Sequence, residues 1–307
     1  MWGPLFRRSH VALRRERVEM ADGDFVDLDW GPESATTSAA TPLVLVLHGL
    51  EGTSSSHYVV GLVRLIAARG WRPAVLYFRS CSGELNRLPR FYHSGDTADL
   101  DAVVCRLLER EPELRLGVIG VSLGGNVLLK WLGERDVDAP KQVAGAVAIS
   151  VPFDLVHCAR VLDRGFERAV YTTNFLRSLK DKVREKAKRY PGFVDVEAVL
   201  RARTFGEYDR TLTAPLHGFA DEHDYWTRSS CGPYLARIRR PVLLINALDD
   251  PFVPPSALPD TRMLPPNVEA AFVATGGHCG FIEGRWPWRA ESWAERRAVE
   301  FLAGALR

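Results

Sequence analysis

Residues 120–124 read Gly120-Val121-Ser122-Leu123-Gly124, between the apolar run Leu114 to Ile119 and the helix-like segment Asn126 to Leu132. A serine that stands where a strand turns directly into a helix forms a nucleophile elbow, because the strained backbone pushes its hydroxyl outward for attack. The flanking glycines matter since larger side chains would collide in so tight a turn. This stretch predicts that Ser122 is a nucleophile.

The pentapeptide alone is a weak signal, because a chain of this length contains one by chance roughly once in ten. Two later features strengthen it. The strand-like run Val242 to Asn246 leads into an acidic loop at 247–254, and the run Val268 to Val273 leads into a glycine-rich loop that contains His278. A serine hydroxyl needs a base within hydrogen-bond reach, and that base needs an acid that fixes its tautomer. The order serine, aspartate, histidine therefore predicts a catalytic triad with His278 as its base.

The acid is one of two adjacent residues, Asp249 and Asp250, and a backbone loop can present either of them. We prefer Asp250, because its spacing to Pro254 matches the Asp-x-x-x-Pro loop that often follows this strand in hydrolases. Asp249 is then expected to accept a hydrogen bond from a loop amide.

The oxygen anion of a tetrahedral intermediate needs hydrogen-bond donors, normally the amide after the nucleophile and one amide from the loop after an earlier strand. Leu123 supplies the first amide. The second is expected from Leu50, in the loop HGLEG at 48–52, which follows the strand-like run Leu43 to Leu47. For His48 we favour a role in orienting the backbone over a role in proton transfer.

Seven motifs, spread from about Pro42 to beyond His278, carry a resemblance to a known family. They are HGLEG at 48–52, FRSCSGELN at 78–86, YHSGDTADL at 92–100, GVSLGGN at 120–126, TAPLHGF at 213–219, ALDDPFVP at 247–254 and GGHCGFIEG at 276–284. The chain resembles the YheT-type branch of the α/β-hydrolases, which also contains the plant EMB8 proteins and animal abhydrolase-domain lipid enzymes. This combination is far more specific than the serine pentapeptide alone.

Carried over residue by residue, the resemblance implies Ser122 as nucleophile, Asp250 as its acid and His278 as base. It also implies an α/β-hydrolase fold and carboxylic esters as substrates, with lipid esters among them in some members. The chain departs from the family pattern at Tyr77, where an asparagine is expected, and at Ser80, where a glycine is expected. Both lie in a loop that we expect at the edge of the site, so they should affect substrate shape rather than triad chemistry.

The composition agrees with a soluble enzyme. With 307 residues, of which 46% are apolar and 25% charged, the chain can bury a large core as one α/β domain with an insertion. A formal net charge of +2 gives no reason to expect a nucleic-acid partner. The five cysteines are widely spaced and form no CxxC pair, which argues against a disulfide framework or a zinc site. No glycine-rich phosphate-binding motif occurs either, so we predict no cofactor.

Strand-like and helix-like segments alternate along most of the chain and predict a mostly parallel central sheet. The segments Arg15 to Met20 and Asp24 to Trp30 precede it as antiparallel strands. Helices are expected over Tyr58 to Arg69 and Thr97 to Arg110. A further strand is expected over Gln142 to Ser150.

The alternation then stops for roughly ninety residues, a stretch too long for an ordinary loop. We therefore predict a core domain formed by 1–151 and 240–307, with a mainly helical cap inserted at 152–239. Insertions at this point commonly shape the acyl pocket of a hydrolase, so the aromatic residues of the cap are candidate pocket walls. These residues are Phe153, Phe166, Phe175, Phe205, Tyr225 and Trp226.

One cap segment predicts a basic amphipathic helix. Its apolar stripe is Leu176, Leu179, Val183, Ala187 and Tyr190, and its basic residues are Lys180, Lys182, Arg184, Lys186, Lys188 and Arg189. Such a helix can lie on anionic lipid, but Asp181 and Glu185 interrupt the charge, so we favour a solvated outer face over membrane contact. The first ten residues hold no apolar stretch long enough for a signal peptide, and no later run approaches eighteen apolar residues. A cytoplasmic monomer is the expectation.

The sequence thus predicts a serine hydrolase that cleaves small-molecule carboxylic esters through an acyl-enzyme. The same machinery supports a thioesterase or a lipase, and only the shape of the pocket separates these activities. An alternative from a different class is a ligand-binding or interaction protein that keeps the hydrolase scaffold without turnover.

Overall fold

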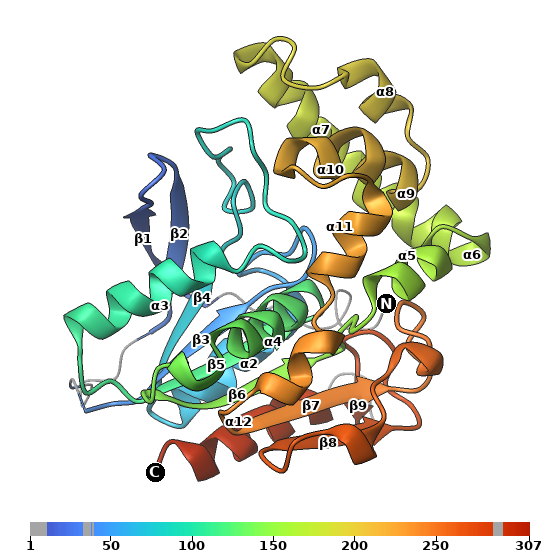
Figure 1. Cartoon of the computed structure of the whole chain (residues 1–307). Coiled ribbons are helices and arrows are strands. Elements are labelled where there is room, and N and C mark those ends of the chain that lie inside the picture. Colours follow the sequence, from blue (N-terminus) through green and yellow to red (C-terminus); the bar gives the residue numbers. More distant parts are fainter. Residues whose placement is uncertain (1–10, 33–37, 39, 285–290) are drawn as a thin grey trace.

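The computed structural model describes residues 11–32, 38, 40–284 and 291–307. Residues 1–10, in which the sequence predicts no signal peptide, lie outside this range. The centre of the molecule is an eight-stranded mixed sheet (Figure 1). In spatial order its strands are β1 (Arg14–Glu19), β2 (Phe25–Trp30), β4 (Arg72–Leu76), β3 (Leu43–Leu47), β5 (Leu116–Val121), β6 (Val143–Ile149), β7 (Val242–Ala247) and β8 (Val268–Val273).

The first two strands form the antiparallel hairpin that the sequence predicts, closed by a hydrogen bond from the Met20 amide to the Asp24 carbonyl. Strand β2 also runs antiparallel to β4, whereas β4, β3, β5, β6, β7 and β8 are parallel to one another. Parallel strands that are covered on both faces read as continuous apolar runs. Every residue of β3, β5 and β7 is accordingly buried. The predicted mostly parallel sheet with antiparallel N-terminal strands is confirmed.

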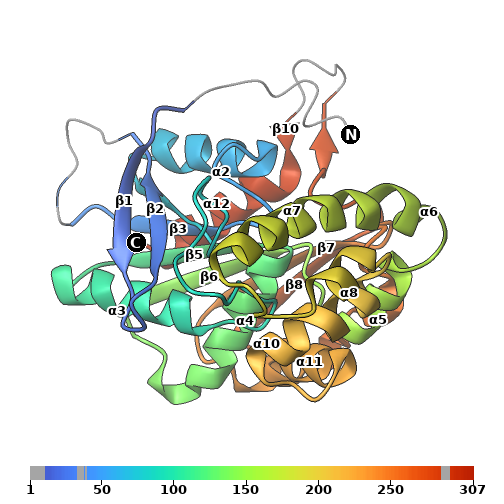
Figure 2. The same ribbon diagram turned by 90° about the horizontal axis from the view of Figure 1, so that it is seen from above.

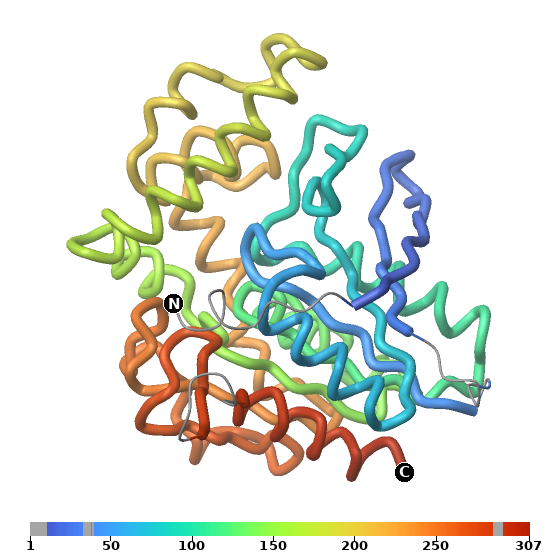
Figure 3. The backbone as a smooth tube through the Cα atoms, turned by 180° about the vertical axis from the view of Figure 1, so that it is seen from behind, coloured from blue at the N-terminus to red at the C-terminus, as the bar shows by residue number. Residues whose placement is uncertain are grey.

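Helices cover both faces of the sheet (Figures 1 and 3). They are α2 (His57–Ala68) and α12 (Trp293–Ala305) on one face, and α3 (Ala98–Arg110) and α4 (Leu123–Arg135) on the other. Because successive side chains of a strand point to opposite faces, β3 contributes to both cores. Val44 and Val46 pack with α2 and α12, whereas Leu43, Leu45 and Leu47 pack with α3 and α4. The helices predicted over 58–69 and 97–110 appear as α2 and α3, with ends that differ by at most one residue.

A helical insertion separates β6 from β7. Its helices are α5 (Leu155–Leu162), α6 (Gly165–Glu167), α7 (Thr173–Arg189), α8 (Val196–Arg201), α9 (Phe205–Tyr208), α10 (Ala214–His217) and α11 (Glu222–Ser229). Figure 2 shows them over the end of the sheet that holds β6 and β7, away from β1 and β2. A short ribbon of β9 (Ile282–Glu283) and β10 (Glu291–Ser292) precedes α12. Among the described residues, no helix combines the length and apolarity needed to cross a bilayer.

Helix α7 differs from its prediction on one face. Lys186 is fully buried and the Lys182 side chain is only 18% exposed. The prediction that these two lysines belong to a solvated outer face is wrong, because their ammonium groups find acceptors in the core. Lys186 donates to the carbonyl oxygens of Leu88 and Arg90, and Lys182 donates to the carboxylate of Glu51. Two of the basic side chains therefore attach the cap to the core.

Candidate active site

Ser122 lies between the carboxyl end of β5 and the first residue of α4. Its backbone has φ 54° and ψ −119°, a region that residues other than glycine rarely occupy. A Cβ atom built on Gly120 would lie 2.4 Å from the Gly124 carbonyl oxygen. A Cβ on Gly124 would lie 2.6 Å from the carbonyl oxygens of Leu47 and His48. The turn predicted at 120–124 is thus present, and both glycines are required by backbone contacts.

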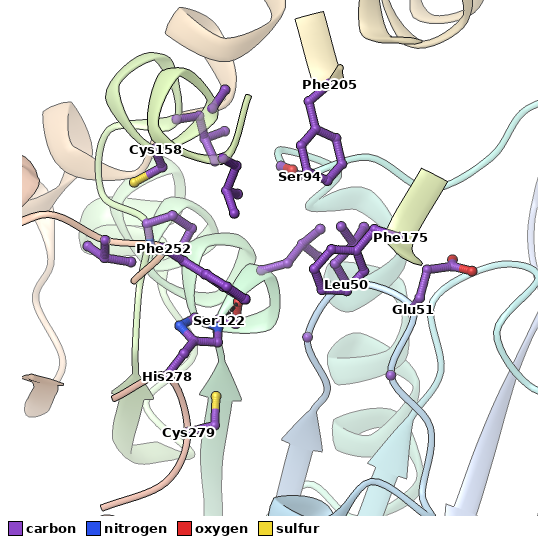
Figure 4. Close-up of a pocket in the computed structure, with 18 of the residues that line it drawn as sticks. Leu50, Glu51, Ser94, Ser122, Cys158, Phe175, Phe205, Phe252, His278 and Cys279 are labelled. Carbon is purple, nitrogen blue, oxygen red and sulfur yellow. Dashed lines mark hydrogen bonds between the residues drawn. The ribbon is translucent and has the colours of Figure 1, made fainter. Parts of the chain in front are cut away.

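The structure brings Ser122 together with the predicted histidine, as Figure 4 shows, and with the predicted aspartate. His278 Nε2 lies 2.9 Å from Ser122 Oγ, and His278 Nδ1 lies 2.8 Å from Asp250 Oδ2. The Asp250 side chain is fully buried, and its other oxygen accepts hydrogen bonds from the amides of Phe252 and Val253. The three groups therefore form one hydrogen-bonded chain from hydroxyl to carboxylate, although they come from three separate loops.

Asp249, the other candidate acid, points elsewhere. Its Oδ1 accepts hydrogen bonds from the amides of Gly276 and Gly277, each at 2.8 Å. These amides immediately precede His278, so Asp249 holds the loop while Asp250 contacts the imidazole. The geometry fits the preference for Asp250 and the expectation that Asp249 binds a loop amide.

The charge state of His278 depends on these contacts. Burial lowers the pKa of this imidazole, but the neighbouring Cys279 and the carboxylate of Asp250 outweigh burial, so the pKa of His278 lies well above its ordinary value. The same effect stabilises an imidazolium that forms when the histidine accepts a proton from the serine.

The loop at 48–52 is held on both sides of Leu50. The Gly49 amide donates to the Tyr58 hydroxyl, and the Glu51 amide donates to the Tyr92 hydroxyl. The Leu50 amide makes no hydrogen bond with any residue that the structure describes, and Leu50 lines the same cavity as Ser122. The Leu123 amide belongs to the first turn of α4, where backbone N–H groups have no partner within the helix. Neither predicted donor thus has a backbone hydrogen-bond partner among the described residues, and their role as oxyanion donors stays a prediction.

His48 has the arrangement expected of a residue that orients the backbone. Its ring is fully buried, with Nδ1 2.8 Å from the Gly49 carbonyl oxygen, while Nε2 accepts a hydrogen bond from the Phe78 amide. Burial lowers the pKa of His48 to about 4. The imidazole is thus neutral near pH 7 and is occupied by the backbone on both sides.

A cavity of about 330 Å³ opens beside Ser122, between the core and the cap. Its walls are mainly apolar, and include Leu50, Leu123, Leu155, Leu162, Phe175, Phe205, Trp226, Phe252 and Val253. Figure 4 shows Phe175, Phe205 and Phe252 around the space next to Ser122 and His278. Its volume lies at the lower end of the range for small-molecule sites.

Four of the six aromatic residues predicted as pocket walls line this cavity: Phe175, Phe205, Tyr225 and Trp226. The prediction is wrong for the other two. Phe153 is buried away from the cavity among core residues, and Phe166 is 67% exposed. Tyr77 and Ser80, the two departures from the family pattern, do not line the cavity either, so they do not shape it by direct contact.

Several residues of the cavity were not predicted from the sequence, among them Phe252, Asp209 and Glu51. The Phe252 ring contacts the His278 ring at a tilt of 37°, with ring centroids 4.2 Å apart, and its place two residues after Asp250 was the only signal. Asp209 is a buried carboxylate that accepts hydrogen bonds from Trp226 Nε1 and the Thr213 hydroxyl, and burial raises its pKa to about 7. The third is Glu51, in the loop beside Leu50. In the part of the chain that the structure describes, no group of three or more histidine, cysteine, aspartate or glutamate residues could hold a metal ion.

Comparisons with known proteins agree with this architecture. The family model described as alpha/beta hydrolase fold matches residues 42–285. The chain is 41% identical over 294 residues to the Escherichia coli (strain K12) protein named "Putative esterase YheT", over 95% of this chain and 85% of that protein. It is 31% identical over 297 residues to human "Phospholipase ABHD3", over 95% and 72% of the two chains.

Among solved structures, the esterase Pf2001 of Pyrococcus furiosus has a TM-score of 0.61 with this chain at 19% identity. The match covers 97% of this chain and 92% of that one, and it shows a shared fold. The identity to YheT confirms the resemblance carried by the seven motifs. From the family match, the two relatives and the eight-stranded sheet, we conclude that the chain belongs to the α/β-hydrolase fold family, in its YheT-like branch.

Proposed function

We propose that this protein is a serine hydrolase that cleaves carboxylic esters. The observation that carries the proposal is the hydrogen-bonded chain from Ser122 to His278 to Asp250 at the wall of an apolar cavity. A hydroxyl with a base at 2.9 Å, and an acid that orients that base, is the arrangement that activates a serine for acyl transfer.

In the proposed reaction, Ser122 Oγ attacks the ester carbonyl while His278 Nε2 takes its proton. The amides of Leu50 and Leu123 donate to the resulting oxygen anion. His278 then passes the proton to the leaving alcohol, which leaves an acyl group on Ser122. Water attacks this acyl-enzyme with His278 again as base, so the acid is released and the free serine returns.

The apolar cavity is the proposed binding site of the acyl chain. Transfer of an apolar chain from water into an apolar cavity is favourable. The walls of this cavity hold few polar groups. The names of the relatives, an esterase and a phospholipase, support an ester of this kind. These names support ester hydrolysis, but they do not identify the alcohol group of the substrate.

The test is labelling with a fluorophosphonate, which reacts only with an activated serine. We expect labelling of the wild type and none of Ser122→Ala. Ser256→Ala is a matched control, since the Ser256 hydroxyl also lies near a histidine, 3.4 Å from His157 Nε2, but is exposed. It should label like the wild type. A folded wild type that does not label would instead favour a ligand-binding protein without turnover.

A panel of p-nitrophenyl esters then reports the substrate. Turnover that disappears in Ser122→Ala supports ester hydrolysis by this site. Faster turnover of matched thioesters than of oxygen esters would favour a thioesterase, and a preference for the shortest acyl chains would count against a lipase.

A further inference from the structure

Helix α7 presents one face to the active site. Phe175, Ser178, Lys182 and Lys186 are three or four residues apart, so they lie along one side of the helix. Phe175 lines the cavity, and Ser178 and Lys182 reach the carboxylate of Glu51. The same helix therefore carries part of the pocket wall and contacts the loop that contains Leu50.

The Glu51 side chain is 8% exposed and accepts four hydrogen bonds, one of them from the Cys81 thiol to Oε1 at 3.9 Å. Its Oε1 accepts from Lys182 Nζ at 2.6 Å and from the Tyr92 hydroxyl at 2.9 Å, and its Oε2 accepts from the Ser178 hydroxyl. The Tyr92 hydroxyl in turn accepts from the Glu51 amide at 3.0 Å. Tyr92 thus bonds both the backbone and the side chain of Glu51.

The Glu51 backbone needs such support. Its φ of 55° lies in the left-handed region, which a residue other than glycine rarely adopts unless its surroundings enforce it. Glu51 directly follows Leu50, which lines the cavity and whose amide has no hydrogen-bond partner among the described residues. If the Glu51 backbone relaxed to a negative φ, the chain next to Leu50 would turn and the amide would no longer keep its direction. An oxyanion donor is effective only when it is already aimed at the oxygen.

We propose that Glu51 is a positioning residue that keeps the Leu50 amide aimed at the reacting carbonyl oxygen, by tying the loop at 48–52 to cap helix α7 through Lys182 and Ser178. The inference rests on the proposed hydrolase function and adds to it. It assigns a catalytic consequence to the Glu51–Lys182 ion pair, which connects the core to the cap across 131 positions of sequence.

The test compares Glu51→Gln, Lys182→Met and the double variant in hydrolysis of a p-nitrophenyl ester. Complete removal of an oxyanion donor lowers kcat about 10²–10³-fold, so a misdirected donor should lower kcat roughly tenfold. We expect this loss in each single variant, with KM within about twofold of the wild type, because the ground-state ester does not need the donor. The double variant should be no slower than the slower single variant, since both changes break one interaction.

Lys186→Met is the matched control. Lys186 lies one turn further along α7 and also fastens the helix to the core, but to the carbonyls of Leu88 and Arg90 rather than to Glu51. Lys186→Met should lower the Tm, while its kcat stays within about twofold of the wild-type value. If Lys186→Met lowered kcat as much as Glu51→Gln, general loosening of the cap would explain the result and the proposal would be overturned.

Tyr92→Phe keeps the ring that stacks on Phe78 but removes two of the hydrogen bonds to Glu51, so it covers the case in which Glu51→Gln does not fold. Its kcat should fall by a factor of roughly three to ten at unchanged KM. Unchanged kcat in folded Glu51→Gln or Tyr92→Phe would overturn the proposal. Turnover that survives Ser122→Ala would refute the hydrolase function itself, which is a different outcome.

Discussion

At the scale of single residues, the two aspartates after β7 show how neighbouring carboxylates take different roles. Asp250 is buried and contacts the imidazole, whereas Asp249 is exposed and accepts two loop amides. A carboxylate that contacts His278 fixes the tautomer in which Nδ1 carries the proton and Nε2 is free to accept one. A carboxylate that holds the loop affects only where the imidazole lies.

Asparagine at each position separates these roles. Asp250→Asn should lower kcat by about 10⁴-fold, because the amide stabilises the wrong tautomer of His278. Asp249→Asn keeps an oxygen that can accept both amides, so kcat should fall less than about tenfold. Steady-state kinetics with one p-nitrophenyl ester measures both. A large loss in Asp249→Asn with normal turnover in Asp250→Asn would reverse the assignment.

The pH dependence follows from the direction of the His278 shift. The pKa of His278 lies well above 6.5, and only the neutral imidazole can accept the serine proton, so kcat/KM should fall as the pH drops through that raised pKa. Asp250→Asn removes a carboxylate that favours the imidazolium, so the pKa should fall and the acidic limb of the residual activity should move to lower pH. Profiles of kcat/KM measure the shift. If the acidic limb of the kcat/KM profile lay at the same pH in Asp250→Asn as in the wild type, Asp250 would not determine the pKa of His278.

The candidate catalytic side chains were predictable from the sequence, but the contacts that support the loop beside them were not. Ser122, Asp250 and His278 follow parallel strands, and the carboxyl ends of such strands meet at one edge of the sheet. The side-chain partners of Glu51 lie between 30 and 131 positions away, in loops of the core and in the cap. No periodicity or spacing relates these segments, so only packing brings them together.

At the scale of helices and strands, the close approach of β5, α4 and β3 leaves no room at Gly124. Alanine there would place its Cβ 2.6 Å from two backbone oxygens, and the backbone cannot yield as a side chain could. We expect Gly124→Ala to lower the free energy of unfolding by about 3 kcal/mol or more and to abolish labelling of Ser122. Denaturant titration and the fluorophosphonate assay measure the two effects.

Gly304→Ala is the opposite case and serves as control. Gly304 lies near the end of helix α12, and apart from its own stretch of helix no described residue has an atom within 4 Å of its Cβ position. Because alanine favours a helix more than glycine does, this change should raise the free energy of unfolding by up to about 1 kcal/mol. Equal stability of the two variants would mean that Gly124 is not crowded as described.

Element type was predictable because hydrophobic pattern decides it, whereas the direction of single side chains was not. The strand predicted over 268–273 appears unchanged as β8, and the hairpin over 15–30 appears as β1 and β2. The prediction for Lys182 and Lys186 of α7 was wrong because an amphipathic pattern is interpreted on the assumption that charged side chains face solvent. Lys186 instead reaches two carbonyl groups of a distant core loop, and pattern alone does not reveal such acceptors.

At the scale of the whole molecule, the cavity belongs to the core and the cap together. The core supplies Ser122 and His278, and the cap supplies Phe175 and Phe205. The sequence predicts that a cap follows β6, but which of its aromatic rings face the core depends on how seven helices pack on one another. Acyl selectivity should therefore change through the cap while the reaction chemistry stays with the core.

Phe205→Ala tests this division. Removal of the Phe205 ring enlarges the apolar cavity. Each additional acyl methylene bound there contributes about 1–3 kcal/mol to transition-state binding. The ratio of kcat/KM for a long over a short p-nitrophenyl ester should therefore rise about tenfold or more. The ratio is measured within one variant, so a smaller folded fraction cancels out. Phe166→Ala, which removes an exposed cap phenylalanine outside the cavity, should leave the ratio unchanged. The same ratio in both variants would mean that the acyl chain does not occupy this cavity.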